Sequence, residues 1–193
     1  MIGSTMSFLE DDYLRAADRL GVPVARIKAV AEVESNGATF WTIGGEQKPP
    51  IRHEAHWFGK LTGYRFNASH PEISSTRWDP RLAAGTRAGA WAQHLAAAAL
   101  DEAAAIQSVS WGPFQIMGFH WQKLGFASPQ GMRDAMFSAA GQLDAFMRFI
   151  KASPVIEDAL QRGDYEAFES GYNGGGYGGA YARKIEDAEA RYS

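Results

Sequence analysis

One stretch of the sequence decides the fold: Val24-Ala-Arg-Ile-Lys-Ala-Val-Ala-Glu-Val-Glu34. Its apolar residues recur with the period of an amphipathic helix, and Ile27, Val30 and Ala31 lie seven, four and three residues before Glu34. Residues at these spacings share one face of a helix, and the apolar face is the one that a helix buries. We therefore expect Glu34 to point inward, where an apolar side chain is the usual occupant.

The predicted position of Glu34 changes its acid–base chemistry. Burial removes water from a carboxylate and raises its pKa, and the end of a helix is the negative pole of the helix dipole. Both effects favour the protonated form near neutral pH, which is the form that a general acid needs. The alternative is an exposed Glu34 in a frayed last turn. Glu32 lies on a different face, one turn after Lys28, and is expected to be surface charge.

Size and composition limit the class of protein. A chain of 193 residues suits one domain over residues 1–193, in which we place a small lobe at residues 38–86. The content of 46% hydrophobic and 21% charged residues is typical of a globular protein. A formal net charge of −3 without a Lys/Arg block argues against nucleic-acid binding. The absence of cysteine excludes disulfides, thiolate catalysis and cysteine-ligated metals.

Local patterns predict a mostly α fold (α+β), a helical domain with a small β-hairpin or irregular lobe. Glycine and proline interrupt short apolar runs throughout residues 38–86, which favours the hairpin or irregular lobe there. Ser7 and Glu10 form a capping-box pattern that predicts a first helix ending at Gly21. Further helices are expected at residues 24–35, 87–107, 128–152, 154–162, 164–171 and 178–191.

Four short blocks follow one another along the chain. They are Glu32-Val-Glu-Ser35, Ile51-Arg-His-Glu-Ala-His-Trp-Phe58, Ser110-Trp-Gly-Pro-Phe-Gln-Ile-Met117 and Tyr172-Asn-Gly174. Each block alone has an ordinary explanation as a turn, a piece of core or a helix end. Their order carries the information, because four such blocks are not expected to recur together by chance.

Together the blocks resemble the lysozyme-like superfamily, which includes goose-type lysozymes and lytic transglycosylases. More specifically, they resemble the N-acetylmuramidase family of phage endolysins and related bacterial proteins, over roughly residues 24 to 192. In one respect the chain departs from that family, because His53 stands where an aromatic residue usually precedes Glu54. The resemblance implies a lysozyme-like fold in which the small lobe forms one wall of a cleft. It also implies cleavage of the β-1,4 bond between N-acetylmuramic acid and N-acetylglucosamine, with Glu34 as the general acid.

Hydrolysis of a glycoside usually needs a second carboxylate as base or nucleophile. Glu54 is the candidate, because it lies in the second block and within the predicted lobe. The alternative is that Glu54 only pairs with Arg52 or another cation. Asp79 and Glu46 are weaker candidates from the same lobe. Lytic transglycosylases manage with one essential glutamate, so the motifs shared with them leave the alternative of anhydro-muramyl products open.

Substrate-binding residues are expected in and next to the blocks. Aromatic rings stack on sugar rings, although core packing is the more common fate of any single ring. Amide side chains offer donors and an acceptor to acetamido groups. The candidates are Trp57, Ser110, Trp111, Phe114, Gln115, Tyr172 and Asn173.

A metal site is not expected. The run His53-Glu-Ala-His56 places its second histidine one residue too early for the zinc-protease motif. We expect no metal and no cofactor. Two other classes stay open as alternatives, a zinc amidase and a non-catalytic peptidoglycan-binding module, although the latter should have lost Glu34.

The expected partner is the glycan strand of peptidoglycan, bound by a monomer without nucleic acid. The first residues lack a basic start and a continuous apolar core, which indicates no signal peptide, and no apolar run reaches the roughly 20 residues of a membrane span. We therefore expect synthesis in the cytoplasm and action on the cell wall in the periplasm after release by another factor, as in phage lysis.

Overall fold

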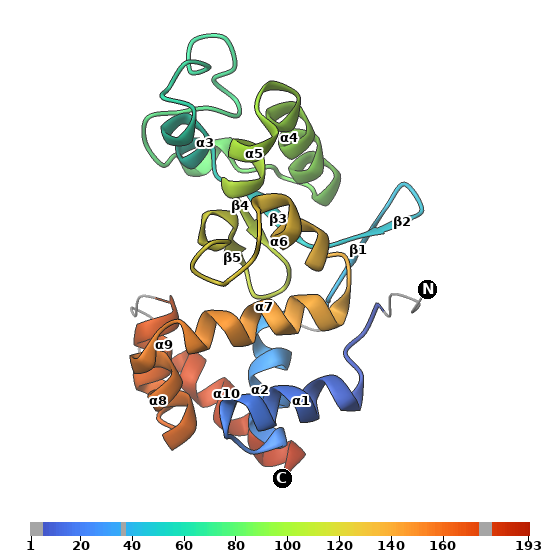
Figure 1. Cartoon of the computed structure of the whole chain (residues 1–193), viewed down its shortest axis with the longest axis vertical. Coiled ribbons are helices and arrows are strands. Elements are labelled where there is room, and N and C mark those ends of the chain that lie inside the picture. Colours follow the sequence, from blue (N-terminus) through green and yellow to red (C-terminus); the bar gives the residue numbers. More distant parts are fainter. Residues whose placement is uncertain (1–5, 36–37, 174–178) are drawn as a thin grey trace. The chain divides into compact units, whose positions relative to one another are not determined.

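The chain forms two units in the computed structural model shown in Figure 1. The first unit combines Met1–Thr39 with Ser138–Ser193, and the second holds Phe40–Phe137. The structure describes residues 6–35, 38–173 and 179–193. Within these ranges helices dominate and the strands form two small antiparallel sheets, so the predicted mostly α, lysozyme-like fold class is confirmed. None of the described helices is long and apolar enough to cross a membrane.

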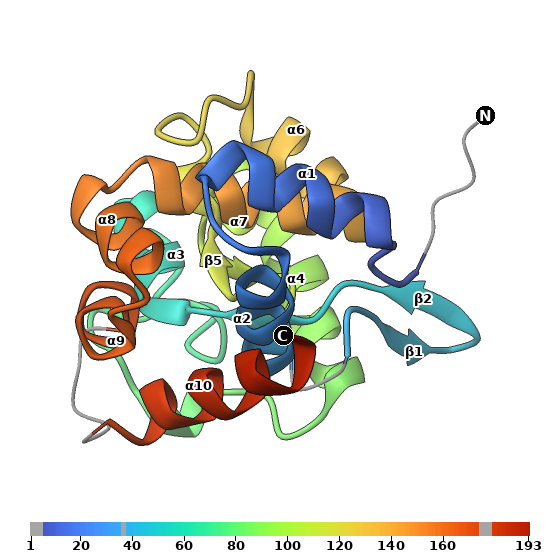
Figure 2. The same ribbon diagram turned by 90° about the horizontal axis from the view of Figure 1, so that it is seen from below.

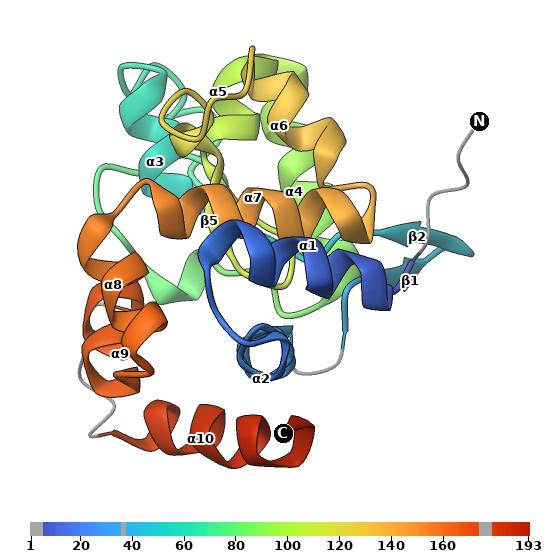
Figure 3. The same ribbon diagram turned by 60° about the horizontal axis from the view of Figure 1, so that its bottom comes forward.

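The first unit is helical in its described residues. Its helices are α1 (Glu10–Leu20), α2 (Val24–Ser35), α7 (Ala139–Lys151), α8 (Pro154–Arg162), α9 (Tyr165–Asn173) and α10 (Ala180–Tyr192). Helix α2 packs against both α1 and α10, and Figure 3 shows it end-on between them. Ile27 and Val30 are fully buried and Ala31 is nearly so, which confirms the predicted inward face of α2.

The predicted cap of the first helix is wrong. Helix α1 begins three residues after Ser7, and its N-cap residue is Leu9. The carboxylate of Asp12 accepts a hydrogen bond from the backbone N–H of Leu9 at 2.9 Å, so a side chain from within the first turn does the capping. At the other end the prediction holds, because Gly21 adopts φ 65° and closes the helix.

Two predicted helices are each divided in two by a capping side chain. The span 87–107 consists of α4 (Arg87–Leu100) and α5 (Glu102–Gln107), and the Asp101 carboxylate accepts the N–H of Ala104. The span 128–152 consists of α6 (Pro129–Ala135) and α7, which starts after Ser138. An N-cap satisfies N–H groups that a new helix leaves free, so these side chains stabilise a restart rather than a continuation.

The second unit contains the strands. Strands β1 (Trp41–Ile43) and β2 (Glu46–Lys48) form the hairpin visible in Figure 2. Strands β3 (Ile51–His53), β4 (Val109–Trp111) and β5 (Ile116–Met117) form the other sheet, in the order β3-β4-β5. The register pairs Arg52 with Ser110, so the sheet brings the second and third sequence blocks side by side.

Helices and turns complete the second unit. Helix α3 (Ala55–Leu61) follows β3 directly, and the short 3-10 turns are η1 (Pro80–Leu82) and η2 (Gly118–His120). Helix α5 packs against α3, α4 and α6. One part of the core joins Phe58 of α3 to Ile73 and to alanines of α4 and α5. The unit therefore has its own buried interior, around which the motif residues are placed.

Candidate active site

The carboxyl group of Glu34 lies in the last turn of α2 and is partly buried. The hydroxyl of Tyr181, from α10, donates a hydrogen bond to its Oε1. Burial raises the pKa of Glu34 from 4.5 to about 8. The carboxyl group is therefore mostly protonated at neutral pH, which is the state that the sequence predicts for a general acid.

An aromatic cluster from α9 and α10 surrounds this carboxyl group. The ring of Phe168 stacks on that of Tyr172 with centroids 5.4 Å apart, and on that of Tyr181 at 6.5 Å. Burial, and then the charge of Glu34, raises the pKa of Tyr172 well above its usual value. The Tyr172 phenol therefore stays neutral and lies within electrostatic reach of Glu34. Tyr181, through its hydrogen bond, and Tyr172, through its electrostatic interaction, place this cluster beside the carboxyl group that burial keeps protonated.

Helix α10 is tied to α9 at the point where it presents Tyr181. The next residue, Ala182, donates its backbone N–H to the carboxylate of Glu169 at 3.2 Å. Glu169 is only 3% exposed. Neither Tyr181 nor Glu169 is predicted from the sequence. Tyr181 is 147 residues from its partner Glu34, and no local pattern shows which turn of the last helix would meet α2.

Glu54 lies in the second unit, between β3 and α3, and is 7% exposed. Its Oε1 accepts a hydrogen bond from Arg52 Nε at 2.6 Å, and Nδ1 of His56 lies 3.6 Å from its Oε2. Its backbone N–H bonds to the carbonyl oxygen of Ser108. The pairing with Arg52, considered as the alternative role of Glu54, is present. It does not exclude a chemical role, because a nearby cation also stabilises a working carboxylate.

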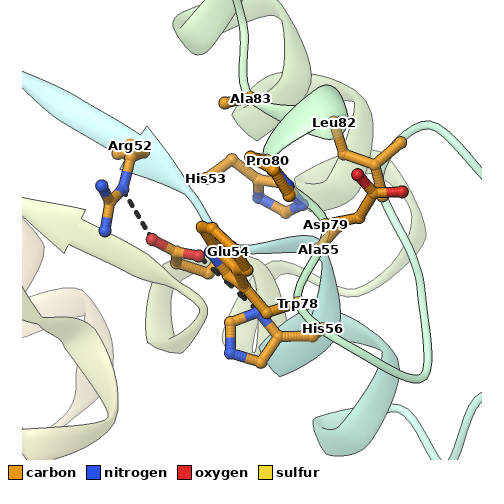
Figure 4. Close-up of a pocket in the computed structure, with 10 residues that line it drawn as sticks. All are labelled: Arg52, His53, Glu54, Ala55, His56, Trp78, Asp79, Pro80, Leu82 and Ala83. Carbon is orange, nitrogen blue, oxygen red and sulfur yellow. Dashed lines mark hydrogen bonds and ion pairs between the residues drawn. The ribbon is translucent and has the colours of Figure 1, made fainter.

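A cavity of about 160 Å³ opens beside Glu54 (Figure 4). Arg52, His56, Trp78 and Asp79 contribute to its walls. The ring of Trp78 is 63% exposed, so it offers an accessible apolar surface at this cavity. Trp78 is not predicted from the sequence, since a lone tryptophan in an irregular segment carries no positional signal.

The two weaker carboxylate candidates, Asp79 and Glu46, each form an ion pair with a neighbouring cation. Asp79 forms a bidentate pair with Arg81, whose hydrogen bonds lower the pKa of Asp79 to about 2. Glu46 is exposed and pairs with Lys48 at 3.1 Å. Neither carboxylate has the enclosed surroundings of Glu54.

Three of the predicted binding residues of the third block, Ser110, Trp111 and Phe114, are buried. The indole of Trp111 is fully buried and donates to the carbonyl oxygen of Ile106 at 2.9 Å, and Phe114 is 3% exposed. The Trp111 ring packs against the rings of Trp91 and His94 inside the second unit. Neither Trp111 nor Phe114 shows the exposed face that stacking on a sugar needs. Ser110 is also buried, and its hydroxyl contacts the sulfur of Met117 at 3.2 Å.

Gln115 and Trp57 are the accessible candidates of the second unit. Gln115 is exposed, has a φ of 49°, and its Nε2 donates to the carbonyl oxygen of Gly112. A positive φ in a residue with a side chain costs free energy, and such strained positions cluster at functional sites. Trp57 is half-buried, with its ring 4.3 Å from that of Phe119 and Lys60 Nζ above it at 4.6 Å. The side chain of Asn173 lies outside the described residues.

The two histidines of the second block have different surroundings. His53 is buried, and its Nε2 hydrogen-bonds to the carbonyl oxygen of Ile73 at 2.8 Å, whereas His56 lies beside Glu54. Among the described residues, no three histidine, aspartate or glutamate side chains converge in the way that a metal ion requires.

Comparisons with known proteins agree on one relationship. The family model described as Muramidase, N-acetylmuramidase, matches residues 23–193. Among solved structures, the crystal structure of the Burkholderia AP3 phage endolysin is similar, with 38% sequence identity and a TM-score of 0.86. The similarity covers 97% of this chain and 71% of that one. A search of curated proteins gives no match.

Proposed function

Because this chain belongs to the N-acetylmuramidase family, we propose that it hydrolyses the β-1,4 bond between N-acetylmuramic acid and N-acetylglucosamine. At the coarser level, the family and the endolysin neighbour identify it as a peptidoglycan hydrolase. The observation that supports the finer proposal is a partly buried Glu34 with a pKa of about 8. Such a group holds a proton at neutral pH and can release it to a leaving oxygen.

Glu34 is the proposed general acid. Its Oε1 accepts the hydrogen bond from Tyr181, so the acid proton belongs on Oε2. Oε2 then delivers this proton to the glycosidic oxygen as the bond to the sugar carbon breaks. Positive charge develops on the sugar ring, and the alcohol leaves as a neutral group. The Tyr181 hydroxyl keeps the carboxyl group oriented during this transfer.

Glu54 is the proposed second carboxylate. As an anion held by Arg52, it would either take a proton from the attacking water or form a bond to the sugar carbon itself. Its Oε2, with His56 as the neighbour at 3.6 Å, is less firmly engaged than Oε1. Trp57, Gln115 and Tyr172 are the proposed substrate contacts. Trp78 joins them because its ring is exposed beside Glu54.

We propose a monomer that forms one lysozyme-like domain over residues 1–193, needs no metal or cofactor, and acts on the glycan strands of peptidoglycan in the cell wall.

The test is mass spectrometry of the fragments released from purified sacculi, combined with Glu54→Gln. We expect reducing muramic acid ends, and hydrolysis slowed by about 10²-fold or more in Glu54→Gln, the scale of one positioned proton-transfer group. Asp79→Asn is the matched control, because Asp79 lines the same cavity but is held by Arg81.

Other products would identify other enzymes. Anhydro-muramyl ends would contradict hydrolysis and indicate a lytic transglycosylase, which needs only Glu34. Free stem peptides with intact glycan strands would indicate an amidase. A Glu54→Gln variant as fast as wild type would remove Glu54 from the mechanism.

A further inference from the structure

The second unit has another cavity, of about 360 Å³, and several of its lining residues have no role in the proposed function. Trp41, Arg87 and Gln93 line it, together with Gln115, and we call it the Arg87 cavity. Arg52 and His53 line both this cavity and the one beside Glu54, so the two adjoin. We propose that the Arg87 cavity binds the acidic stem peptide carried by muramic acid, a short amide chain bearing carboxylates. This inference rests on the proposed function for the identity of its ligand.

The charge of Arg87 supports an anionic ligand. Over the described part of the chain, no carboxylate lies within 4.0 Å of its guanidinium, whereas Arg52, Arg65 and Arg81 of the same unit each have one. Arg87 is exposed, and its guanidinium carbon lies 5.6 Å above the ring of Trp41. This cation–π contact holds the guanidinium in place without using its hydrogen-bond donors.

The position of Arg87 in its helix supports the same conclusion. Arg87 is the first residue of α4, directly after the N-cap Thr86, whose side chain accepts the N–H of Gly89. A cation at the positive end of a 14-residue helix is electrostatically unfavourable. A bound carboxylate offsets this repulsion and interacts with both the guanidinium and the helix terminus.

Gln93 supplies a hydrogen-bond acceptor that has no partner. Its Nε2 donates to the carbonyl oxygen of Leu82 at 2.7 Å, which fixes the orientation of the amide. Its Oε1 is buried and accepts no hydrogen bond. Buried acceptors are costly when unsatisfied, and Gln93 lines the Arg87 cavity, so a ligand N–H that reached this oxygen would be stabilising.

These features select the chemistry of the ligand. A carboxylate fits Arg87, an amide N–H fits Gln93 Oε1, and an aliphatic side chain fits the exposed part of Trp41. A neutral sugar lacks the carboxylate, and a free phosphate lacks the apolar part. The D-lactyl-L-alanyl-D-glutamate chain attached to muramic acid carries all three groups within a few bonds of one another.

The experiment measures binding of N-acetylmuramoyl-L-alanyl-D-glutamate to the wild-type protein by calorimetry. This probe has no glycosidic bond to cleave, so binding is separated from hydrolysis. Its analogue with both glutamate carboxylates converted to amides is the ligand control. We expect the di-acid to bind at least tenfold more tightly than the diamide. Arg87→Gln should abolish this preference. Lys123→Gln, which removes an exposed cation outside all the cavities described, should preserve it.

Three results would overturn the proposal: equal binding of acid and diamide, an Arg87→Gln variant that keeps the preference, or equally tight binding of N-acetylmuramic acid without peptide. Melting curves of the variants verify that each is folded, which an exposed position favours. A failure of the proposed function would give a result that differs from these three. Wild type would then leave glycan strands uncut while the Arg87-dependent preference for the di-acid remained measurable.

Discussion

At the scale of single residues, Glu34 and Tyr172 show how burial sets protonation. Both are in the first unit, and for both, loss of water is the first cause of a raised pKa. For a carboxyl group the raised pKa keeps the neutral, protonated form at pH 7, so the group can act as an acid. For a phenol it only keeps the neutral form that it already has. The same surroundings therefore make Glu34 reactive and leave Tyr172 inert as an acid.

Replacing the proposed acid should separate activity from stability. Glu34→Gln keeps the shape and the hydrogen-bond acceptor but has no proton to give, so we expect lysis of purified peptidoglycan to fall by about 10²-fold or more. The amide also removes the cost of burying a carboxylate, so the melting temperature at pH 8 should be equal to or above that of wild type. Turbidity assays and calorimetry measure the two effects. Activity within threefold of wild type would exclude Glu34 as the acid.

The raised pKa of Glu34 also predicts two pH dependences. Activity should decline as pH rises through about 8, because the acid then loses its proton. The stability of the folded protein should also decrease as pH rises. Below pH 4.5 both folded and unfolded Glu34 are protonated, and between 4.5 and 8 only the unfolded form ionises, which favours unfolding. Relative to Glu34→Gln, wild type should therefore lose stability on the order of 5 kcal/mol across this range, and a flat difference between the two unfolding curves would contradict the assignment.

At the scale of elements, α10 matters because it delivers one hydroxyl to α2. The packing of α10 against both α2 and α9 fixes where Tyr181 lies, and Glu169 fixes the first turn of α10. A helix with this many charged residues would otherwise be read as a surface helix. Its buried face, at Ala182, Ile185 and Ala188, sets the rotation that aims Tyr181 at Glu34.

Removing this hydroxyl tests the positioning role. Tyr181→Phe keeps the ring stacked on Phe168 but loses the donor to Glu34 Oε1. We expect kcat to fall about tenfold with little change in KM. The alkaline limb of the pH profile should move upward, because a hydrogen bond to the carboxylate form has been lost and the pKa of Glu34 rises further. An unchanged pH profile would assign Tyr181 a structural role only. Tyr192→Phe, also on α10 but bonded to Glu32, is the matched control.

At the scale of the whole molecule, the two units respond differently to pH. The second unit buries His53 and His94, each with an Nδ1 that has no hydrogen-bond partner. Burial, reinforced by His53 and Arg133, lowers the pKa of His94 to about 4. The carboxyl group of Glu34 in the first unit weakens the fold as pH rises, whereas these histidines weaken it as pH falls.

Acid should therefore destabilise the second unit first. Between pH 6.5 and about 4, unfolded His94 binds a proton that folded His94 does not, so stability falls as pH decreases. We expect His94→Gln, which cannot be protonated, to reduce this acid-dependent loss by on the order of 3 kcal/mol. Hydrogen exchange at pH 7 and pH 4.5 would locate the change in residues 40–137 of wild type. Identical acid dependence in the variant would show that other groups control it.

Much of the fold follows from local sequence. The inward face of α2 can be predicted from Ile27, Val30 and Ala31, since helical periodicity repeats within a few residues. The order of the four blocks identifies the family, and the family match confirms it. The positions at which helices are interrupted follow less directly from the sequence, because capping by side chains competes with helical periodicity. The caps at Asp101 and Ser138 end helices whose apolar pattern continues past them, because a side chain satisfying free N–H groups outweighs periodicity there.

The sequence by itself determined that a carboxyl group lies on the buried face of a helix, and that an acid with a raised pKa should result. Only the tertiary structure decided what surrounds each motif residue. Packing of α10 on α2 brings Tyr181 to Glu34, and the β3–β4 register and the helices around it place Trp111 in the interior rather than at the surface. The physical reason is range. Periodicity and capping act over a few residues, whereas these contacts join segments up to 147 residues apart, and only the packing of complete elements fixes them.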